Sequence, residues 1–311
     1  MTVPMETTST GRSLTLRRPD DPRPRPGRRS RPLFRPGAGR QAHAGPLAYL
    51  LLGLMTVLSL FPLYWTMVAA STSSQAINRA NPPLLPGGNL ISHLGTAWQH
   101  ADLGTAVLNS FVVSGSVALS TVLFSTLAGF AFAKLRFRFR TALLLVVIAT
   151  TAVPPQLSVI PLFQIMTSLG WYDHLPAVIA PTLVSAVGVF FMRQYLAEAL
   201  PYELIEAARV DGAGSHRIFW HVVLPMARPA MLVLFLITFV QSWNDFFWPF
   251  VVLTSENPTV QVAMVKLAQG FVPDQSVIMA GALLGTLPLL LLFLVFGRRI
   301  VGGLIQGALK G

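Results

Sequence analysis

The chain has 311 residues, of which 53% are apolar and only 11% charged, and its formal net charge is +11 at pH 7. Because soluble domains contain about 25% charged residues, this composition indicates an integral membrane protein. The sequence has no cysteine, which excludes disulfides, thiolate metal sites and cysteine nucleophiles.

The N-terminal segment, residues 1–46, is rich in arginine and proline and has almost no aliphatic run. It cannot bury enough apolar surface to fold alone, so we expect a disordered cytoplasmic tail. Its positive charge suits anionic lipid on the cytoplasmic membrane face. Nucleic-acid binding is disfavoured, because Phe34 is the single Phe, Trp or Tyr of this segment and the tail is tethered to a membrane.

Residues 47–311 contain six apolar segments, each long enough to cross roughly 30 Å of hydrocarbon as a helix. Backbone polar groups inside lipid must be bonded within their own segment, which favours helices. The predicted fold is therefore an all-α polytopic membrane protein with six transmembrane helices. We place the spans near residues 47–70, 106–132, 142–166, 177–196, 229–253 and 277–298.

Lysine and arginine are distributed very unequally around these spans. All but two of the 23 lie in the tail, in the loops after the second and fourth spans, or near the C-terminus; the exceptions are Arg79 and Lys266. By the positive-inside rule, both termini and the loop 198–228 are cytoplasmic. The intervening loops then face outward, where they either meet a solute-binding protein or are simply solvated.

Two predicted spans carry residues that are unusual inside a membrane. Pro154-Pro155 interrupt the third span, and broken helices at mid-membrane often line transport pathways; a packing kink is the alternative. Asn244-Asp245 fall in the fifth span, and an aspartate there usually faces a cavity or a partner, unless it lies at the outer interface. We predict these four residues as candidates for the translocation pathway.

The loop 198–228 contains the segment 203–214, which is rich in charged residues of both signs. Pro201 suits the first position of a helix, and Glu203 and Glu206 follow early in it, where carboxylates offset the positive end of the helix dipole. The pattern predicts one short apolar stripe at helical spacing, made of Leu204, Ile205 and Ala208.

This first helix of the loop has a clear stop. Gly212 and Gly214 end it, because glycine accepts the left-handed C-terminal position without steric cost. Ser215 is then expected to cap a second short helix that runs toward Leu224-Pro225. The sequence thus predicts a helix, a tight turn and a second helix, exposed between two membrane spans.

The residues that catalysis or nucleotide binding would require are missing from the sequence. There is no G-x-x-x-x-G-K-[ST] phosphate loop, and His216 and His221 are five apart, off the shared face of an H-E-x-x-H zinc site. No G-x-S-x-G nucleophile elbow occurs. We therefore predict that the chain is not an enzyme and that it binds no metal or other cofactor itself.

The spaced pattern in the loop resembles the Glu-Ala-Ala (EAA) loop of the membrane subunits of binding-protein-dependent ABC importers. It comprises Glu206-Ala207-Ala208, Asp211-Gly212-Ala213, Leu224-Pro225 and Pro229. In that family the loop is a coupling helix that docks into a cleft of the cytoplasmic ATPase. The resemblance implies a type I importer permease fold and an ATPase-coupling role for Glu203, Glu206, Ala207, Ala208, Asp211, Gly212, Ala213, Leu224 and Pro225.

The resemblance extends from about residue 47 to the C-terminus, and residues 1–46 have no counterpart in the pattern. Softer similarities favour the carbohydrate-uptake branch, in its maltose-type inner-subunit form. They are Asn109-Ser110, residues 131–137, residues 160–163, Met192-Arg193-Gln194, Trp243-Asn244-Asp245 and the glycine-rich end after residue 302.

The resemblance implies a plasma-membrane permease subunit that translocates a sugar or oligosaccharide. Its implied partners are a second homologous permease subunit, two ATPase subunits that bind ATP and Mg²⁺, and an extracytoplasmic solute-binding protein. One alternative is import of another solute, such as a polyamine or a sugar phosphate. An ion-coupled carrier is disfavoured, because Asp245 is the only clear ionisable residue in a predicted span.

Overall fold

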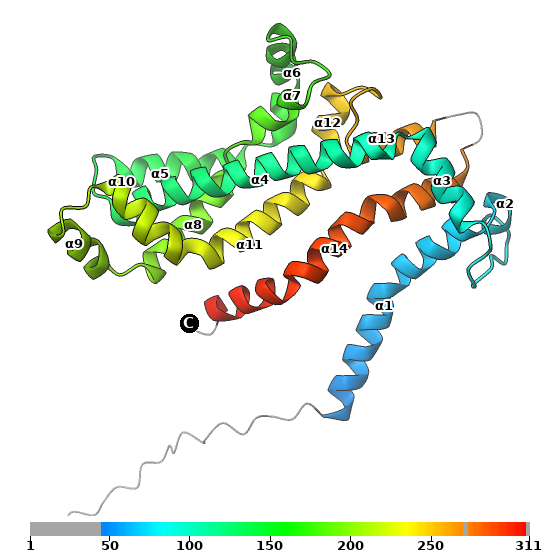
Figure 1. Ribbon diagram of the computed structural model, residues 1–311, viewed down its shortest axis with the longest axis horizontal. Coiled ribbons are helices and arrows are strands. Elements are labelled where there is room, and N and C mark those ends of the chain that lie inside the picture. Colours follow the sequence, from blue (N-terminus) through cyan, green and yellow to red (C-terminus); the bar gives the residue numbers. More distant parts are fainter. Residues whose placement is uncertain (1–44, 270–272, 309–311) are drawn as a thin grey trace, which may run out of the picture. The chain divides into compact units, whose positions relative to one another are not determined.

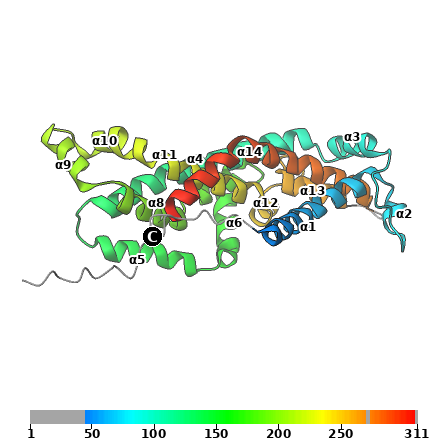
Figure 2. The ribbon, with the colours of Figure 1, turned by 90° about the horizontal axis from the view of Figure 1, so that it is seen from below.

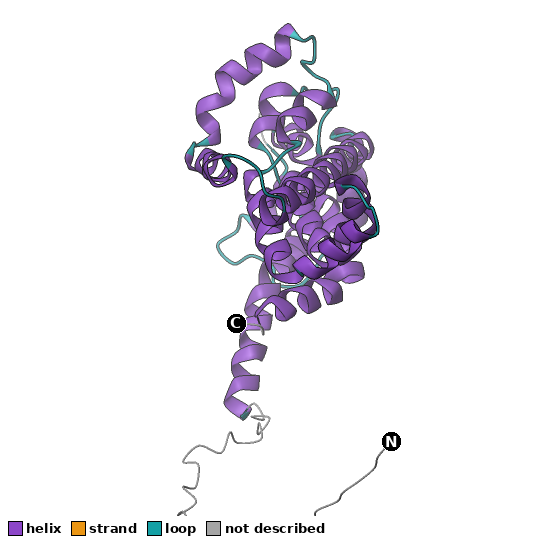
Figure 3. Cartoon of the chain, turned by 90° about the vertical axis from the view of Figure 1, so that its left-hand side faces the viewer, coloured by secondary structure: helices purple, strands orange, loops and turns teal. Residues whose placement is uncertain are grey.

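The computed structural model describes residues 45–269 and 273–308, with side chains up to Gly297. Almost the whole of the predicted tail lies outside these residues. Every regular element of the described part is helical, as Figure 3 shows, and this agrees with the predicted all-α class. The α-helices are α1 (Pro46–Ser71), α2 (Ser74–Ile77), α3 (Leu90–His100), α4 (Leu103–Lys134), α5 (Arg140–Ala149), α6 (Val159–Ser168), α7 (Leu175–Ile179), α8 (Ala186–Ala199), α9 (Tyr202–Val210), α10 (Ser215–Ile218), α11 (Leu224–Trp243), α12 (Phe247–Val252), α13 (Val260–Ala268) and α14 (Gln275–Ala308).

Four helical stretches in the described residues are long and apolar enough to cross a membrane: Pro46–Ser71, Leu103–Lys134, Ser215–Trp243 and Gln275–Gly297. Two further candidates are bent pairs, Arg140–Ala152 with Pro155–Ser168 and Leu175–Thr182 with Ala186–Ala199. By length and composition there are thus up to six spans, if each bent pair counts as one, and they correspond to the six predicted segments.

The third predicted span breaks at the double proline, as the sequence indicates. The two halves meet at an angle of 88°. Val153, which precedes the prolines, has ψ 118°, and Pro154 itself has ψ 126°. A residue before proline is pushed out of the helical region by the proline ring, so two consecutive residues leave the helix here.

The fifth predicted span, 229–253, is wrong at both ends. The helix starts at Ser215, runs through the π-helical turn Phe219–Val223 and ends at Trp243. Leu224-Pro225 do not end a short helix but continue it. Proline lacks an N–H and clashes with the carbonyl four residues earlier. The wider π turn just before Pro225 shifts the register of the backbone hydrogen bonds, so the helix continues through the proline.

Contacts divide the chain into two units, Met1–Met55 and Thr56–Gly311, and the packing described here belongs to the second. Helix α4 is at its centre and packs against α8 and α11 (Figures 1 and 2). Its buried face includes a row of small residues at helical spacing: Ser110, Ser114, Ala118, Thr121, Ser125, Gly129 and Ala133. Small side chains let helix backbones approach closely, which is how helices associate in membranes.

The opposite face of α4 carries large apolar side chains that the unit leaves about half exposed or more. Leu108 and Leu119 are 64% and 65% exposed, and Phe111, Leu123, Phe124 and Leu127 are also exposed. A contiguous apolar surface of this kind marks contact with lipid or with another protein. Helix α4 therefore combines a row of small residues at its helix contacts with large apolar side chains on its outer face, an arrangement typical of a membrane bundle.

Close approach of α4 and α8 depends on Gly129. A Cβ added there would lie 2.8 Å from the Met192 Cβ and 2.9 Å from the backbone nitrogen of Arg193. We expect Gly129→Ala to destabilise the bundle by about 1–3 kcal/mol, the usual cost of overpacking. The melting temperature and the monodisperse yield in detergent would measure this. Gly115→Ala, in the same helix with open space at the Cβ position, is the control and should be neutral or stabilising; equal behaviour of the two variants would contradict the close approach.

Candidate coupling surface and membrane cavity

Helix α9 forms the first half of the Glu-Ala-Ala loop pattern. Pro201 precedes it in an extended conformation, and Glu203 lies in its first turn. Ile205 is buried and Ala208 half-buried, but Leu204 is 44% exposed, so the predicted three-residue stripe is only partly correct. Leu204 lies about 100° around the helix from Ile205, and the short helix presents only one narrow face to the bundle.

The turn after α9 has the geometry that its glycine predicts. Gly212 has φ +77°. Its N–H donates to the carbonyl of Arg209, and the N–H of Ala213 donates to the carbonyl of Ala208 at 2.9 Å. These two bonds form a Schellman motif, which requires a left-handed residue at this point. Ala208 and Ala213 both pack against the same buried cluster, so the turn is held from inside.

The nine residues assigned to coupling divide between surface and interior. Glu203, Glu206, Ala207, Asp211, Gly212 and Pro225 are exposed, whereas Ala208, Ala213 and Leu224 are partly buried against the apolar cluster around Ile205 and Ile218. The exposed members lie mostly on α9 and its turn and form one surface. The buried members fix that surface to the bundle.

Helix α9 is also anchored at its start, by Lys134 at the end of α4. The Lys134 side chain is only 6% exposed. Its Nζ donates to the carbonyl of Ala197 at 2.9 Å and lies 4.3 Å from the centre of the Tyr202 ring. The Tyr202 hydroxyl donates to the carbonyl of Ala133 at 3.2 Å. The ends of α4 and α8 and the first residue of α9 are therefore joined at one point.

Sequence reasoning did not assign this role to Lys134. A lysine at the end of an apolar segment indicates only a flanking charge on the cytoplasmic side, and its contacts are 63 and 68 positions away along the chain. The polar contacts also bring the loop after the second span to the same end of the unit as α9 (Figure 1).

A cavity of about 540 Å³ lies where three helical segments are interrupted. One interruption follows Ala152, one separates Thr182 from Ala186, and one follows Trp243. The lining residues are Val117, Thr121, Pro155, Val178, Pro181, Thr182, Val184, Ser185, Thr238, Gln241, Ser242 and Asp245. The structure thus brings together positions from α4, η2 (Pro155–Ser158), the α7–α8 connection and α11.

Two of the four predicted pathway residues line this cavity and two do not. Pro155 and Asp245 are among its lining residues; Pro154 and Asn244 are not. The Asn244 side-chain amide donates to the carbonyl of Val240 at 2.8 Å and so caps its own helix. The half-buried Asp245 carboxylate accepts hydrogen bonds from the N–H groups of Phe247 and Trp248 at the start of α12, which holds it in place.

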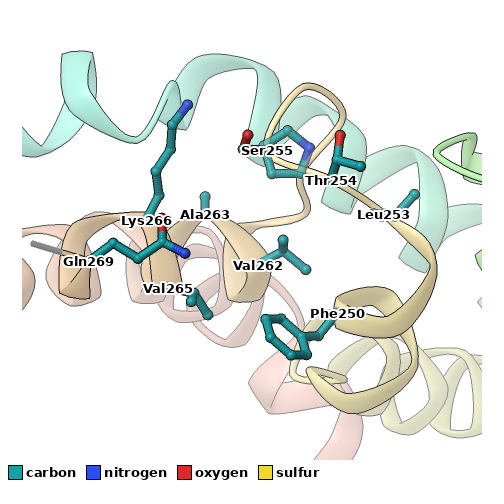
Figure 4. A pocket seen from close by; sticks show the side chains of 10 residues that line it. Phe250, Leu253, Thr254, Ser255, Val262, Ala263, Val265, Lys266 and Gln269 are labelled. Carbon is teal, nitrogen blue, oxygen red and sulfur yellow. The ribbon is translucent and has the colours of Figure 1, made fainter.

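The other end of the unit carries a smaller pocket of about 210 Å³ between α12 and α13. Figure 4 shows Lys266 and Gln269 on one side of it, facing Ser255 and Thr254 across the opening. Asp173 ties this region to the α6–α7 connection, because its carboxylate accepts from the Thr254 N–H at 2.7 Å and from the Thr254 hydroxyl at 2.8 Å. Within residues 45–269 and 273–308, no cluster of three or more His, Asp or Glu side chains offers a metal site.

Apolar helices around small residues, a polar cavity at helix breaks and an exposed helical turn at the basic end together define a membrane permease. Residues 121–305 match the family described as the binding-protein-dependent transport system inner membrane component. The chain belongs to this family, as the loop pattern predicts, and it is a transport permease rather than an enzyme.

Its relatives are similar over most of their length. The sn-glycerol-3-phosphate transport system permease protein of Shigella flexneri is 33% identical over 267 residues, which is 83% of this chain and 94% of the relative. The protein of the same description from Yersinia pestis is 31% identical over 268 residues, 83% and 95% of the two chains. A chain in the crystal structure of a bacterial ABC transporter involved in the import of the acidic polysaccharide alginate superposes with a TM-score of 0.70 at 22% identity, covering 81% of this chain and 94% of that one, and shares the fold.

Proposed function

We propose that this chain is one of two permease subunits of an ATP-driven importer for a sugar or a sugar-derived solute. The observation that carries the proposal is the surface of α9 and its turn, exposed and at the same time anchored through Lys134 and Ala208. A loop helix that merely rests on a membrane surface would need neither a Schellman turn nor a buried lysine at its start.

The proposed partners are a second homologous permease subunit, two ATPase subunits and an extracytoplasmic solute-binding protein. Glu206 and Ala207 enter a groove of one ATPase subunit, which itself binds ATP and Mg²⁺. When the two ATPase subunits close on ATP, α9 moves with them and pulls on the ends of α4 and α8. The helices rock against the partner permease, and the cavity between the helix breaks opens to the other side of the membrane.

The proposed solute class rests on the relatives and on the cavity. The relatives named above are described as permeases for sn-glycerol-3-phosphate, and the structural neighbour belongs to an importer of the acidic polysaccharide alginate. Both solutes carry hydroxyl groups and an anionic group. A sugar phosphate is the second candidate, favoured by the solute of these relatives.

Reconstitution tests the proposal. Proteoliposomes that hold this chain with the second permease, the ATPase and the binding protein should accumulate solute only when ATP is inside with the ATPase. Omission of this chain should abolish both accumulation and the stimulation of ATP hydrolysis by loaded binding protein. Accumulation that persists without ATP, driven by an ion gradient, would contradict the proposal.

The orientation in the membrane gives a separate prediction. The connection from α4 to α5, which contains Arg136 and Arg138, lies at the same end of the unit as α9, whereas α2 and α13 lie at the other end (Figure 1). Arg79 follows α2, and Lys266 belongs to α13. We therefore expect Ser215→Cys to react with a membrane-impermeant maleimide only from the cytoplasmic side, and Leu85→Cys only from outside. The chain has no cysteine of its own, so each label is unique. Labelling of Ser215→Cys from outside would remove the basis for ATPase coupling.

A further inference from the structure

The polar cavity at the helix breaks is lined by one acidic side chain and by no basic one. Asp245 is the one ionisable side chain among its lining residues, and no lysine, arginine or histidine lines it. The other polar lining groups are the hydroxyls of Thr121, Thr182, Ser185, Thr238 and Ser242 and the amide of Gln241. The cavity therefore offers hydroxyl and amide groups, which both donate and accept, beside a single carboxylate, which accepts.

We propose that this cavity is a solute subsite for uncharged polyhydroxylated molecules and that it rejects solutes bearing a phosphate or carboxylate. The inference rests on the proposed function and deepens it by naming the solute class. A sugar hydroxyl donates to the Asp245 carboxylate and accepts from Gln241 or Ser242. A phosphate in the same space meets the Asp245 charge and finds no cation among the lining side chains to offset it.

The dimensions agree with this class of solute. Small-molecule sites in proteins typically occupy about 300–1,000 Å³, and the volume of about 540 Å³ lies within that range. The position agrees as well, because solute sites of transporters are commonly formed where membrane helices are discontinuous. Here the discontinuities are those after Ala152, before Ala186 and after Trp243.

A purely structural role for Asp245 makes a different prediction. Its carboxylate accepts from the backbone N–H groups of Phe247 and Trp248, so it also caps α12. An asparagine at this position keeps an acceptor oxygen for those groups and loses only the charge. Asp245→Asn therefore removes the negative charge while it keeps an acceptor for the N–H groups at the start of α12.

The absence of native cysteine provides the test. Ser242→Cys places one thiol in the cavity, and Ser92→Cys places one on the exposed face of α3. In membranes that hold the assembled transporter, each thiol is treated with a cationic and with an anionic methanethiosulfonate of similar size. The ratio of the cationic to the anionic rate should be about tenfold higher at Ser242→Cys than at Ser92→Cys, as expected for one carboxylate a few ångströms away.

Added solutes and second substitutions complete the experiment. A mixture of glucose, maltose and mannitol should slow modification of Ser242→Cys, and sn-glycerol-3-phosphate at the same concentration should not. Asp245→Asn should bring the rate ratio down to that of the control. If that variant fails to assemble, Gln241→Glu serves instead and should raise the ratio further.

The contrary results are equally definite. A rate ratio no higher than that of Ser92→Cys, protection by sn-glycerol-3-phosphate, or protection by neither probe would overturn the inference. Co-purification of the ATPase is measured on the same membranes. If the ATPase is bound but the cavity thiol shows no preference for the cationic reagent, only the solute class is wrong. If the ATPase is not bound, the importer proposal itself fails.

Discussion

Glu206→Lys should abolish co-purification of the ATPase while the chain still inserts and pairs with the second permease. Glu206 is exposed on α9, so the substitution disturbs no buried contact of the bundle. It reverses the charge in the middle of the proposed contact surface and places a cation nearer the positive end of the α9 dipole. Truncating or reversing a charge in a desolvated interface typically costs about 2–5 kcal/mol of binding free energy.

Glu256→Lys makes the same change of charge at an exposed position of the α12–α13 connection and serves as the control. It should leave the amount of bound ATPase at the wild-type level. The measurement is the ratio of ATPase to permease after affinity purification through a tag on this chain. Equal ratios for Glu206→Lys and wild type would mean that α9 is not the ATPase contact.

Substitution of Gly212 tests the same α9 surface by changing the backbone conformation of its turn rather than a contacting side chain. Its φ of +77° is strained for a β-branched residue, by roughly 1–2 kcal/mol or more, and a Cβ there has nothing within 4 Å. Any defect of Gly212→Val therefore comes from the altered turn and not from a clash. Asparagine tolerates the left-handed region, so Gly212→Asn should retain most of the stimulated ATP hydrolysis that Gly212→Val loses.

The features that the sequence predicted are those fixed by local chemistry. The break at Pro154 follows from proline sterics, and the turn at Gly212 follows from the conformational freedom of glycine. The apolar segments follow from the requirement that backbone groups be bonded within lipid. Each of these causes acts within a few residues along the chain, so one sequence is enough to see it.

The features that the sequence did not predict depend on distant parts of the chain. Asp245 and Pro155 were predicted separately, but only the fold places both in one cavity with Thr121 and Ser185. Pro225 was expected to end a helix, because the π turn that accommodates it has no clear sequence signal. Lys134 appears in the sequence as a flanking charge, and its partners become visible only when α4, α8 and α9 are assembled.

Lys134 therefore gives the second prediction, a loss of coupling without a loss of binding. Lys134→Met keeps the length of the buried aliphatic chain but removes the ammonium group, and with it the bond to the Ala197 carbonyl and the contact with the Tyr202 ring. A hydrogen bond to a charged group contributes about 1.5–3 kcal/mol, and a desolvated cation–π contact contributes about 2 kcal/mol. Helix α9 would keep its outer surface and its Schellman turn, but its start would no longer be held to α4 and α8.

The expected result is normal co-purification of the ATPase together with a strongly reduced stimulation of hydrolysis by loaded binding protein and reduced uptake. Lys134→Arg, which can still donate to the Ala197 carbonyl and lie against the ring, should restore part of the stimulation. Tyr202→Leu should produce the same defect as Lys134→Met. Because the two side chains form one anchor, the double variant should be little worse than either single variant. If Lys134→Met takes up solute at the wild-type rate, movement of α9 reaches the bundle by another route, and the buried lysine serves stability alone.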